Sequence, residues 1–333
     1  MSVFISIITP VFNEEKHIAK CLASLVEQDY DSTQYEILVV DGMSTDQTRE
    51  IVTDFAKKYN NIKLFDNPNR TAPYALNIGL KHAKGDVIIR VDGHAIVQKN
   101  HLSLCIEYLQ QTNVECVGGV IESINDTKLG KAIAMAMSSP FGVGNARFRT
   151  SSHMEGYVDT LAFGAYRQEV FKKIGVFDEE FERNQDDEFN YRLRKAGGKI
   201  YLTPKIKIYY YPRASIRKLW KQYFQYGFWK VRVMQKHLEM MQIRQFIPAL
   251  FILAILASLM IGIFYRPFFW VFLTICVSYI SLSFYSSLKI SFVKKIDYLP
   301  LLPAIFACLH FSYGIGFYFG LLRFAKYWIG RRA

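Results

Sequence analysis

The stretch FISIITPVFNEEKHIAKCLASLVEQDYDSTQYEILVVDG, residues 4–42, decides the fold. It opens and closes on short apolar runs, FISIITP and YEILVVDG, and turn-forming residues follow each run, as is typical of buried strands. Between them, EKHIAKCLASLVEQ places Ile18, Leu22, Leu25 and Val26 on one helical face. A strand, a helix and a strand in this order predict two parallel strands joined by a right-handed crossover.

The same alternation continues along the first 120 residues. A helical pattern (QTREIVTDFAKKY, 47–59) is followed by a short strand (IKLF, 62–65), a second helix (within 72–85) and a strand that ends at Asp92. This rhythm predicts an α/β domain with a mostly parallel sheet. In such sheets ligands bind at the carboxyl ends of the strands.

Polar side chains gather at those strand ends, in TPVFNEE, VVDGMSTDQT and VDGH. Asn13 and Glu14 could simply cap a helix, and Thr45 and Asp46 fit a turn followed by a helix cap equally well. Asp41 is different, because it ends an apolar strand, where an unpaired carboxylate is costly. We therefore expect Asp41 to contribute to a binding site.

Charge divides the chain into two parts. From residue 201 onward there are 18 Lys and Arg but only two acids, Glu239 and Asp297, so this part has a formal charge of +16. The whole chain carries +12, which leaves −4 for residues 1–200. The basic part also contains three nearly charge-free apolar stretches at 246–264, 268–286 and 299–322, each about as long as a helix that crosses a bilayer. Three such stretches favour membrane attachment over a soluble helical core.

A basic and aromatic segment precedes these stretches. In SIRKLWKQYFQYGFWKVRVMQK, residues 215–236, apolar and aromatic side chains recur at helical spacing with Lys and Arg beside them. This pattern is typical of a helix in a membrane interface, and the neighbouring apolar stretches argue against nucleic acid as the partner. The predicted organisation is an α/β domain (1–212), an amphipathic helical segment (213–245) and a membrane region (246–333).

The topology follows from the positions of the basic residues. MSVFISIITP does not resemble a secretory signal, so we expect the α/β domain to stay in the cytosol. Five dispersed cysteines fit reduced thiols better than disulfides or a zinc site. Two membrane crossings return the chain to the cytosol at SLKISFVKK, as the positive-inside rule prefers. A third crossing would export the basic C-terminus, which the positive-inside rule disfavours. The segment 299–322 could therefore be re-entrant, and two and three crossings both stay open.

The motifs together resemble glycosyltransferase family 2, whose members have the GT-A fold, and in particular its membrane-associated exopolysaccharide enzymes similar to succinoglycan glucosyltransferases. ITPVFNEE, VVDGMSTDQT, NRTAPYALNIGLKHAKGD, RVDGHA and IGVFDEEFERNQDDEFNYRLRKAGGK carry the resemblance, in the family's order, over residues 4–212. The resemblance implies a nucleotide-sugar donor whose base and ribose contact Pro10, Asn13, Glu14 and Asp41. A carboxylate can accept hydrogen bonds from uracil or from guanine, so this carboxylate does not identify the base. We expect a UDP-linked donor.

The resemblance also implies a divalent cation at RVDGHA. The family usually has Asp-x-Asp here, and the carboxylates bind a cation that holds the donor diphosphate. In this chain Asp92 is the first carboxylate and His94 stands at the second position. His94 is interpreted as a second ligand or as a hydrogen-bond donor to phosphate, with a structural role as the alternative. The expected cation is Mn²⁺ or Mg²⁺, and an imidazole ligand would favour Mn²⁺. Asp92 is also expected to contact the nucleotide.

The segment RNQDDEFNYRLRKAGG, residues 183–198, opens a predicted helix with acids in its first turn. These acids could simply favour the helix dipole. The family resemblance implies a catalytic base here, and counting back from Arg192-Leu193 places it at Asp186, with Asp187 as the second candidate and Gln185 in place of the usual Glu. Between the motifs, Asp159, Phe163 and Gly164 are candidates for the acceptor pocket, although Phe163 and Gly164 fit a core equally well.

These features predict an inverting, metal-dependent hexosyltransferase on the cytosolic side of the membrane. It would move a sugar from a nucleotide-sugar to an acceptor linked to polyprenyl diphosphate, in the synthesis of surface or exported polysaccharide. Membrane lipids would be its other partner. Two alternatives remain: a catalytically silent sugar-nucleotide-binding regulator, and a nucleotidyltransferase, which would need a triphosphate-binding basic loop that we do not find.

Overall fold

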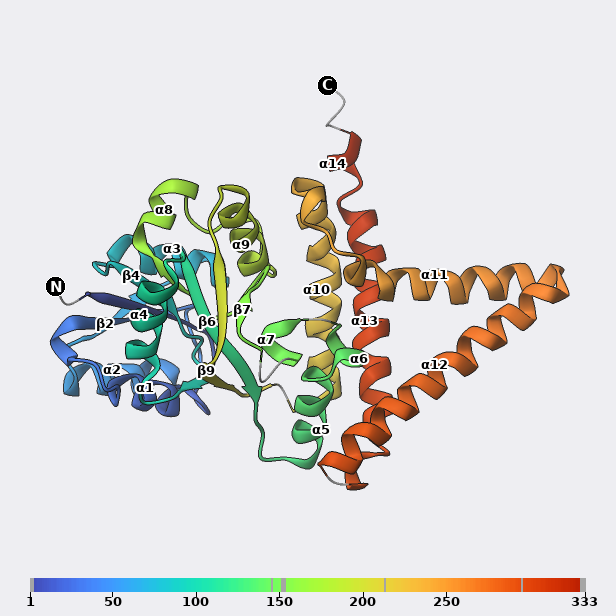
Figure 1. Cartoon of the computed structure of the whole chain (residues 1–333), viewed down its shortest axis with the longest axis horizontal. Coiled ribbons are helices and arrows are strands. Elements are labelled where there is room, and N and C mark those ends of the chain that lie inside the picture. The colour runs from blue at the N-terminus through green and yellow to red at the C-terminus, as the bar shows by residue number, and fades with distance from the viewer. Residues whose placement is uncertain (1–2, 145, 151–153, 213, 295, 330–333) are drawn as a thin grey trace. The chain divides into compact units, whose positions relative to one another are not determined.

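The computed structural model describes residues 3–144, 146–150, 154–212, 214–294 and 296–329. The chain forms two compact units, and neither is continuous in sequence (Figure 1). The first unit comprises residues 1–122 and 147–211, and the second comprises residues 123–146 and 212–333. The segment 123–146, which lies inside the predicted range 1–212, therefore packs with the C-terminal helices.

The first unit is built on one curled sheet with helices on both faces. Its strands are β1 (Ile5–Val11), β2 (Tyr35–Asp41), β3 (Ile62–Asp66), β4 (Val87–Arg90), β5 (Ala95–Val97), β6 (Cys116–Ser123), β7 (Gly156–Tyr157), β8 (Ala165–Arg167) and β9 (Ile200–Tyr210). Its helices are α1 (Ile18–Val26), α2 (Thr48–Lys58), α3 (Ala72–His82), α4 (His101–Thr112), α7 (Arg147–Thr150), α8 (Gln168–Ile174) and α9 (Gln185–Lys195), with a 3-10 turn η1 (Ser32–Gln34).

The sheet is mixed, with the order β3-β2-β1-β4-β8-β6-β9-β5 and with β7 paired to β9. β3, β2, β1 and β4 are parallel, as the repeated strand and helix patterns predict. Beyond β4 the pairs β4–β8, β6–β8, β5–β9 and β7–β9 are antiparallel. The architecture is thus the α/β type that the resemblance to GT-A enzymes implies, with a parallel part that the sequence predicts and an antiparallel part that it does not.

Alternation along the strands builds a core on each face of the sheet. In β1, Ile5 and Ile7 belong to the cluster that packs against α1, α2 and α4. Ile8 points to the opposite face and belongs to the cluster that packs against α3, α8 and α9. Because both faces are covered, β1, β2 and β4 are mostly apolar, and the polar side chains of the predicted site follow the strand ends.

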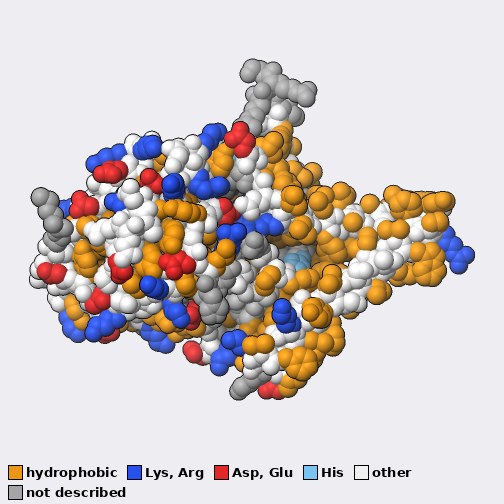
Figure 2. All heavy atoms as spheres, viewed as in Figure 1, with side chains coloured by type: hydrophobic (Ala, Val, Ile, Leu, Met, Phe, Trp, Pro, Cys, Tyr) orange, Lys and Arg blue, Asp and Glu red, His pale blue; other side chains and the backbone are white. Residues whose placement is uncertain are grey.

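The second unit is helical. Its elements are α5 (Lys128–Met137), α6 (Pro140–Val143), α10 (Ile216–Lys236), η2 (Leu238–Met240), α11 (Ile243–Phe264), α12 (Arg266–Val293), η3 (Ile296–Tyr298), α13 (Leu302–Arg323) and α14 (Lys326–Ile329). Within the described residues, α11, α12 and α13 are long and apolar enough to cross a membrane. They correspond to the three apolar stretches of the sequence, and hydrophobic side chains cover the surface of α11 and α12 (Figure 2).

A buried polar contact ties segment 123–146 to these helices. The imidazole of His310 on α13 lies 2.8 Å from the carbonyl oxygen of Phe141 and 2.9 Å from the hydroxyl of Tyr279 on α12. Because a carbonyl only accepts, Nε2 donates to Phe141 and Nδ1 accepts from Tyr279. This contact satisfies both ring nitrogens of the single histidine within the predicted apolar stretches, which gives His310 a structural role.

Candidate active site

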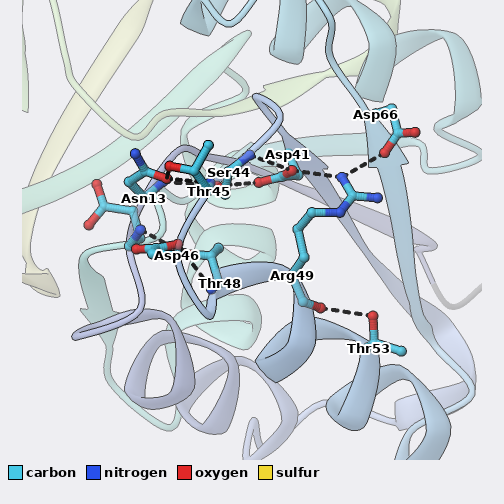
Figure 3. A network of polar contacts seen from close by, with 10 residues as sticks. Asn13, Asp41, Ser44, Thr45, Asp46, Thr48, Arg49, Thr53 and Asp66 are labelled. Carbon is cyan, nitrogen blue, oxygen red and sulfur yellow. Dashed lines mark hydrogen bonds and ion pairs between the residues drawn. The ribbon is translucent and has the colours of Figure 1, made fainter.

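Hydrogen bonds join the loops after β1 and β2 (Figure 3). The backbone N–H of Asn13 donates to Ser44 Oγ (2.9 Å), and Asn13 Oδ1 accepts from the backbone N–H of Thr45 (2.8 Å). The N–H of Glu14 donates to Thr48 Oγ1 at 2.8 Å. The two predicted nucleotide loops therefore form one structure at the carboxyl end of the sheet.

Asp41 is fully buried at the end of β2 and is hydrogen-bonded to the loop that follows it. One carboxylate oxygen accepts from Ser44 Oγ (2.5 Å), and the other accepts from the Ser44 N–H (3.0 Å) and from Arg49 (2.7 Å). Arg49 also pairs with Asp66 at the end of β3 (2.8 Å, Figure 3). The cost of the buried carboxylate is thus met by protein donors. Its contact with the nucleotide base stays a prediction.

Pro10 connects the first loop to the third. It is the penultimate residue of β1, and its carbonyl accepts from the N–H of Gly93 at 3.4 Å. A Cβ at Gly93 would come within 2.6 Å of Val11 Cγ1. Glycine therefore fits between Asp92 and His94, because a larger residue would require Val11 or this loop to move.

Asp92 and Arg90 form a mostly buried ion pair at the end of β4. Nε and one terminal nitrogen of Arg90 donate to the two oxygens of Asp92 at 2.8 and 3.1 Å. Burial alone would raise the pKa of Asp92, but the charge and hydrogen bonds of Arg90 outweigh it and hold this pKa below its ordinary value. Asp92 is therefore a carboxylate, as a cation ligand must be.

His94 lies beside Glu14, with 3.0 Å between His94 Nδ1 and Glu14 Oε1. The edge of the imidazole also faces the ring of Tyr210, whose centroid is 4.9 Å away. Histidines that bind metals commonly donate one ring N–H to a carboxylate and coordinate with the other nitrogen. The structure thus places Glu14 where it can orient His94, a contact that the sequence interpretation of Glu14 as a nucleotide ligand did not include.

The chemistry of Asp92 and His94 fits a divalent cation that takes its remaining ligands from the donor diphosphate and from water. Asp92 offers carboxylate oxygen and His94 offers imidazole nitrogen, and no group of three or more His, Cys, Asp or Glu that could hold a metal occurs among the described residues. A protein that contributes one or two ligands, with phosphate oxygens and water completing the shell, is usual for Mg²⁺ in phosphate chemistry. The imidazole favours Mn²⁺ by comparison.

Asp186 lies in the first turn of α9 and faces this ion pair. A terminal nitrogen of Arg90 lies 3.9 Å from Asp186 Oδ2, so the same guanidinium contacts Asp92 and Asp186. Burial raises the pKa of Asp186 above its ordinary value; Arg90 opposes this shift and Asp187 adds to it. A carboxylate with a raised pKa, next to a proposed cation ligand, has the properties of a general base.

The neighbouring acid, Asp187, is held differently. Its Oδ1 accepts from the hydroxyl of Thr160 at 2.8 Å, and Thr160 in turn accepts from the amide of Asn190 at 3.0 Å. Asn190 is fully buried and also donates to the carbonyl of Leu161 (2.9 Å). Asp187 is therefore part of a network that fixes α9 to the segment after β7, whereas Asp186 lies beside Arg90.

Helix α9 is anchored firmly enough to hold these acids in place. Glu188, which is nearly fully buried, pairs with Arg192 through two hydrogen bonds of 2.7 and 2.9 Å. Arg192 also donates to the carbonyl of Val176 at 2.8 Å. The helix ends at Lys195, with Ala196 as its C-cap, and Gly197 follows with a φ of +85°, as the two glycines of the sequence predict.

The predicted acceptor residues lie near one another in sequence but in different surroundings. Asp159 follows β7 and is half-buried. Phe163 is buried, has a φ of +61°, and its ring lies 5.7 Å from the Arg90 guanidinium and 6.2 Å from the Tyr210 ring. A Cβ at Gly164 would come within 2.8 Å of the sulfur of Cys116, so Gly164 faces the sheet interior. Their contact with an acceptor stays a prediction.

Unusual backbone conformations surround the site. Non-glycine residues with positive φ are uncommon, and in ordered structures they concentrate at functional sites. Five of the six in the described part of the chain lie in loops beside the strand ends or at the start of α9: Asn13, Met43, Arg70, Phe163 and Asn184.

The main residues that sequence reasoning missed are Arg90, Arg49 and Tyr210. A signal existed for Arg90, because residues two apart at a strand end point to the same side, as Arg90 and Asp92 do. No comparable signal existed for Tyr210, because only the pairing of β5 with β9, which puts Ala95 opposite Tyr210, brings it beside His94.

Comparison with known proteins assigns these features to a family. Residues 6–175 match the family described as Glycosyl transferase family 2. The chain is 39% identical over 233 residues to the dolichyl N-acetyl-alpha-D-glucosaminyl phosphate 3-beta-D-2,3-diacetamido-2,3-dideoxy-beta-D-glucuronosyltransferase of Methanococcus voltae, covering 67% of this chain and 72% of that protein. It is 32% identical over 244 residues to the succinoglycan biosynthesis protein ExoA of Rhizobium meliloti, covering 73% of each.

Solved structures share the fold at lower identity. One is the mannosyltransferase PcManGT of Pyrobaculum calidifontis in complex with GDP-Man and Mn²⁺, with a TM-score of 0.59 at 16% identity. The aligned region covers 94% of this chain and 87% of the mannosyltransferase chain. TarS of S. aureus has a TM-score of 0.51 at 19% identity, over 95% of this chain and 55% of its own. At such identities the likeness is one of fold.

Proposed function

Because the chain belongs to glycosyl transferase family 2, we propose that it is an inverting glycosyltransferase at the cytosolic side of a membrane. It moves a sugar from a nucleotide diphosphate sugar to a lipid-linked saccharide during synthesis of surface or exported polysaccharide. The observation that carries the proposal is the position of Arg90, which contacts both Asp92 at the end of β4 and Asp186 at the start of α9. One guanidinium thus links the donor side of the site to the proposed base.

The donor would occupy the joined loops after β1 and β2. These loops and the strand ends before them contain the four predicted nucleotide residues Pro10, Asn13, Glu14 and Asp41. Asp41 keeps the loops in place through its hydrogen bonds to Ser44, which in turn contacts Asn13. The proposed donor is a UDP-sugar, since a carboxylate or backbone carbonyl there can accept the imino N–H of uracil. Asp92 and His94 would hold a divalent cation, which supplies Lewis-acid stabilisation of the leaving diphosphate.

Asp186 is the proposed general base. It takes the proton of the acceptor hydroxyl while that oxygen forms a bond to the anomeric carbon and the bond from this carbon to the diphosphate breaks. The nucleoside diphosphate leaves with the bonding electron pair, and a single displacement inverts the anomeric configuration. The raised pKa of Asp186 supports this role, because a base works best when its pKa is closer to the working pH.

A lipid-linked acceptor is supported by the relatives and by the second unit. The M. voltae relative is named for transfer to a dolichyl phosphate-linked sugar, and the R. meliloti relative for succinoglycan biosynthesis. The helices α11, α12 and α13 are apolar enough to enter a bilayer. Membrane attachment would hold the site close to a sugar whose lipid tail stays in the bilayer.

The general proposal is tested by measuring release of nucleoside diphosphate from a panel of nucleotide-sugars, with and without lipid-linked acceptor. A glycosyltransferase releases nucleoside diphosphate, with acceptor-dependent formation of a glycosidic product. A silent regulator binds a donor without releasing anything, and a nucleotidyltransferase releases pyrophosphate from a nucleoside triphosphate. Either of the last two results would replace the proposed reaction.

The acceptor preference gives a further expected result. The full-length protein in nanodiscs should transfer sugar faster to a polyprenyl diphosphate-linked saccharide than to the same saccharide without its lipid, because the bilayer concentrates the first beside the site. The full chain is needed, since truncation near residue 212 would remove the helices that cover α5. Equal rates on the two acceptors, measured at matched concentrations, would show that the membrane unit only anchors the protein.

The pKa of Asp186 predicts a pH dependence. A base acts in its ionised form, so turnover should rise as pH increases through this raised pKa and should fall below it. Because the charge of Asp187 adds to the shift, Asp187→Asn should move the acidic limb of the profile to lower pH while leaving the plateau nearly unchanged. The measurement is kcat against pH at saturating substrates, and a limb that moves to higher pH would contradict this account.

A further inference from the structure

Helices α10 and α13 of the second unit run side by side in the same direction (Figure 1). Near the start of α10, the thiol of Cys308 lies 3.8 Å from the carbonyl oxygen of Ile216. Near its end, the Gln235 amide donates to the carbonyl of Phe324 at 2.9 Å. The partners are 92 positions apart in the first contact and 89 in the second, and a nearly constant offset means that the two helices are parallel. They are parallel neighbours over most of α10.

The contact between the two helices is too close for lipid to enter. A Cβ at Gly320 would come within 2.5 Å of the carbonyl oxygen of Phe228, and one at Gly316 would collide with that of Phe224. From the α10 side, a Cβ at Gly227 would collide with the carbonyl oxygen of residue 313. Backbones pack this closely only where glycine leaves room, so α10 and α13 behave as one body.

Protein also covers α13 on its α5 and α11 sides. Ile305 and Leu309 pack with Ile133 and Met137 of α5 in one buried cluster. On the α11 side, the hydroxyl of Tyr318 donates to a backbone carbonyl at 2.7 Å. Half of the apolar stretch of α13 is buried, against 17% for α11 and 6% for α12. The apolar character of α13 is therefore explained by protein contacts.

The charges of α10 place α13 outside the hydrocarbon. At a separation of 92 positions, the exposed side chains of Arg217, Lys218 and Lys221 lie level with residues 309–313, the middle of α13. If α13 crossed a bilayer, these three cations would reach its central depth. Charged side chains at that depth are strongly disfavoured, whereas Lys and Arg at a membrane surface are attracted by anionic lipids.

Helices α11 and α12 have the opposite character. Only Tyr265 separates them, and their charge-free runs, 245–264 and 267–288, correspond to about 30 and 33 Å of helix. The hydrocarbon core of a bilayer is about 30 Å thick. Large exposed hydrophobic side chains line both helices (Figure 2), and Tyr265 and Trp270, each about 60% exposed, lie near the tip with Arg266. Aromatic residues are enriched at membrane interfaces.

We propose that the α11–α12 hairpin is the membrane-embedded surface of this protein and crosses the bilayer twice, while α10 and α13 stay together at the cytosolic surface. The partner is lipid hydrocarbon for the hairpin and anionic headgroups for the cations of α10. Arg323 and Lys326 then stay on the cytosolic side, as the positive-inside rule prefers. The inference rests on the membrane attachment proposed above, but not on the sugar-transfer reaction.

The test is labelling of single introduced cysteines in the full-length protein, in sealed vesicles, with a membrane-impermeant maleimide. Suitable positions are Lys57→Cys in the first unit, Arg266→Cys at the hairpin tip and Lys326→Cys after α13, all exposed. The unsubstituted protein is the background, because among the described residues four native cysteines are buried and Cys276 lies within α12. Labelling after detergent solubilisation gives the full signal at each position.

Two crossings predict that Lys57→Cys and Lys326→Cys are labelled from one side of the membrane and Arg266→Cys from the other. Labelling of Lys326→Cys together with Arg266→Cys would mean that α13 crosses, and labelling of all three from one side would mean that the hairpin does not cross. Either result would overturn the proposal. Complete release of the protein by an alkaline carbonate wash would instead remove the membrane attachment on which it rests.

Discussion

Asp186→Asn is expected to lower kcat by about 100-fold or more while leaving donor affinity nearly unchanged. The asparagine keeps the size of the side chain but cannot take the acceptor proton. Asp186 pairs with Arg90 at 3.9 Å and accepts from the backbone N–H of Asp187 at 3.0 Å, and neither of these contacts involves the donor loops. The loss should therefore fall on turnover, because the interaction with the proton exists only during the reaction.

Turnover is measured by formation of glycosylated acceptor, and donor affinity by calorimetric titration with the nucleoside diphosphate. Asp187→Asn is the matched control, since it removes a neighbouring carboxylate that is hydrogen-bonded to Thr160. It should keep most of the turnover. If Asp187→Asn abolishes transfer and Asp186→Asn does not, the base is Asp187 and the assignment to Asp186 is wrong.

Asp92→Ala is expected to abolish transfer at every metal concentration tested, and chelation of divalent cations should abolish it in the unsubstituted protein. Asp92 is the carboxylate that the fit to a cation depends on, and its depressed pKa keeps it ionised. Its removal also leaves Arg90 buried without its bidentate partner, so thermal unfolding must be recorded beside activity. Activity that persists at full rate in excess chelator would exclude the proposed metal site.

His94 and Glu14 allow a sharper test that does not remove the carboxylate. With His94 as a ligand, Mn²⁺ should restore the chelated protein at least as well as Mg²⁺, and His94→Asp should move the preference toward Mg²⁺. Glu14→Gln should weaken metal affinity by about tenfold if its carboxylate orients the imidazole. Metal affinity is read by titration of Mn²⁺ against its electron paramagnetic resonance signal. An unchanged metal preference in His94→Asp would mean that His94 is not a ligand.

The candidate site was largely predictable where its residues follow strands. Apolar runs that end in Asp41 and Asp92 identify the binding edge, because parallel strands bring their carboxyl ends to one side. The first turn of α9 was predictable in the same way, from its acids and from the glycines that end it. The choice between Asp186 and Asp187 was not, because both lie in one helical turn and only their partners, Arg90 and Thr160, distinguish them.

The sequence by itself determined the parallel half of the sheet, the three apolar helices and the family of the chain, because each depends on patterns within a few tens of residues. Tertiary structure decided what depends on distant partners. It joined segment 123–146 to the C-terminal helices, placed Arg90 between Asp92 and Asp186, and paired α10 with α13. All three helices are long and apolar enough to cross a membrane, but half of the apolar stretch of α13 is buried, against 17% for α11 and 6% for α12, so packing separates α13 from the other two.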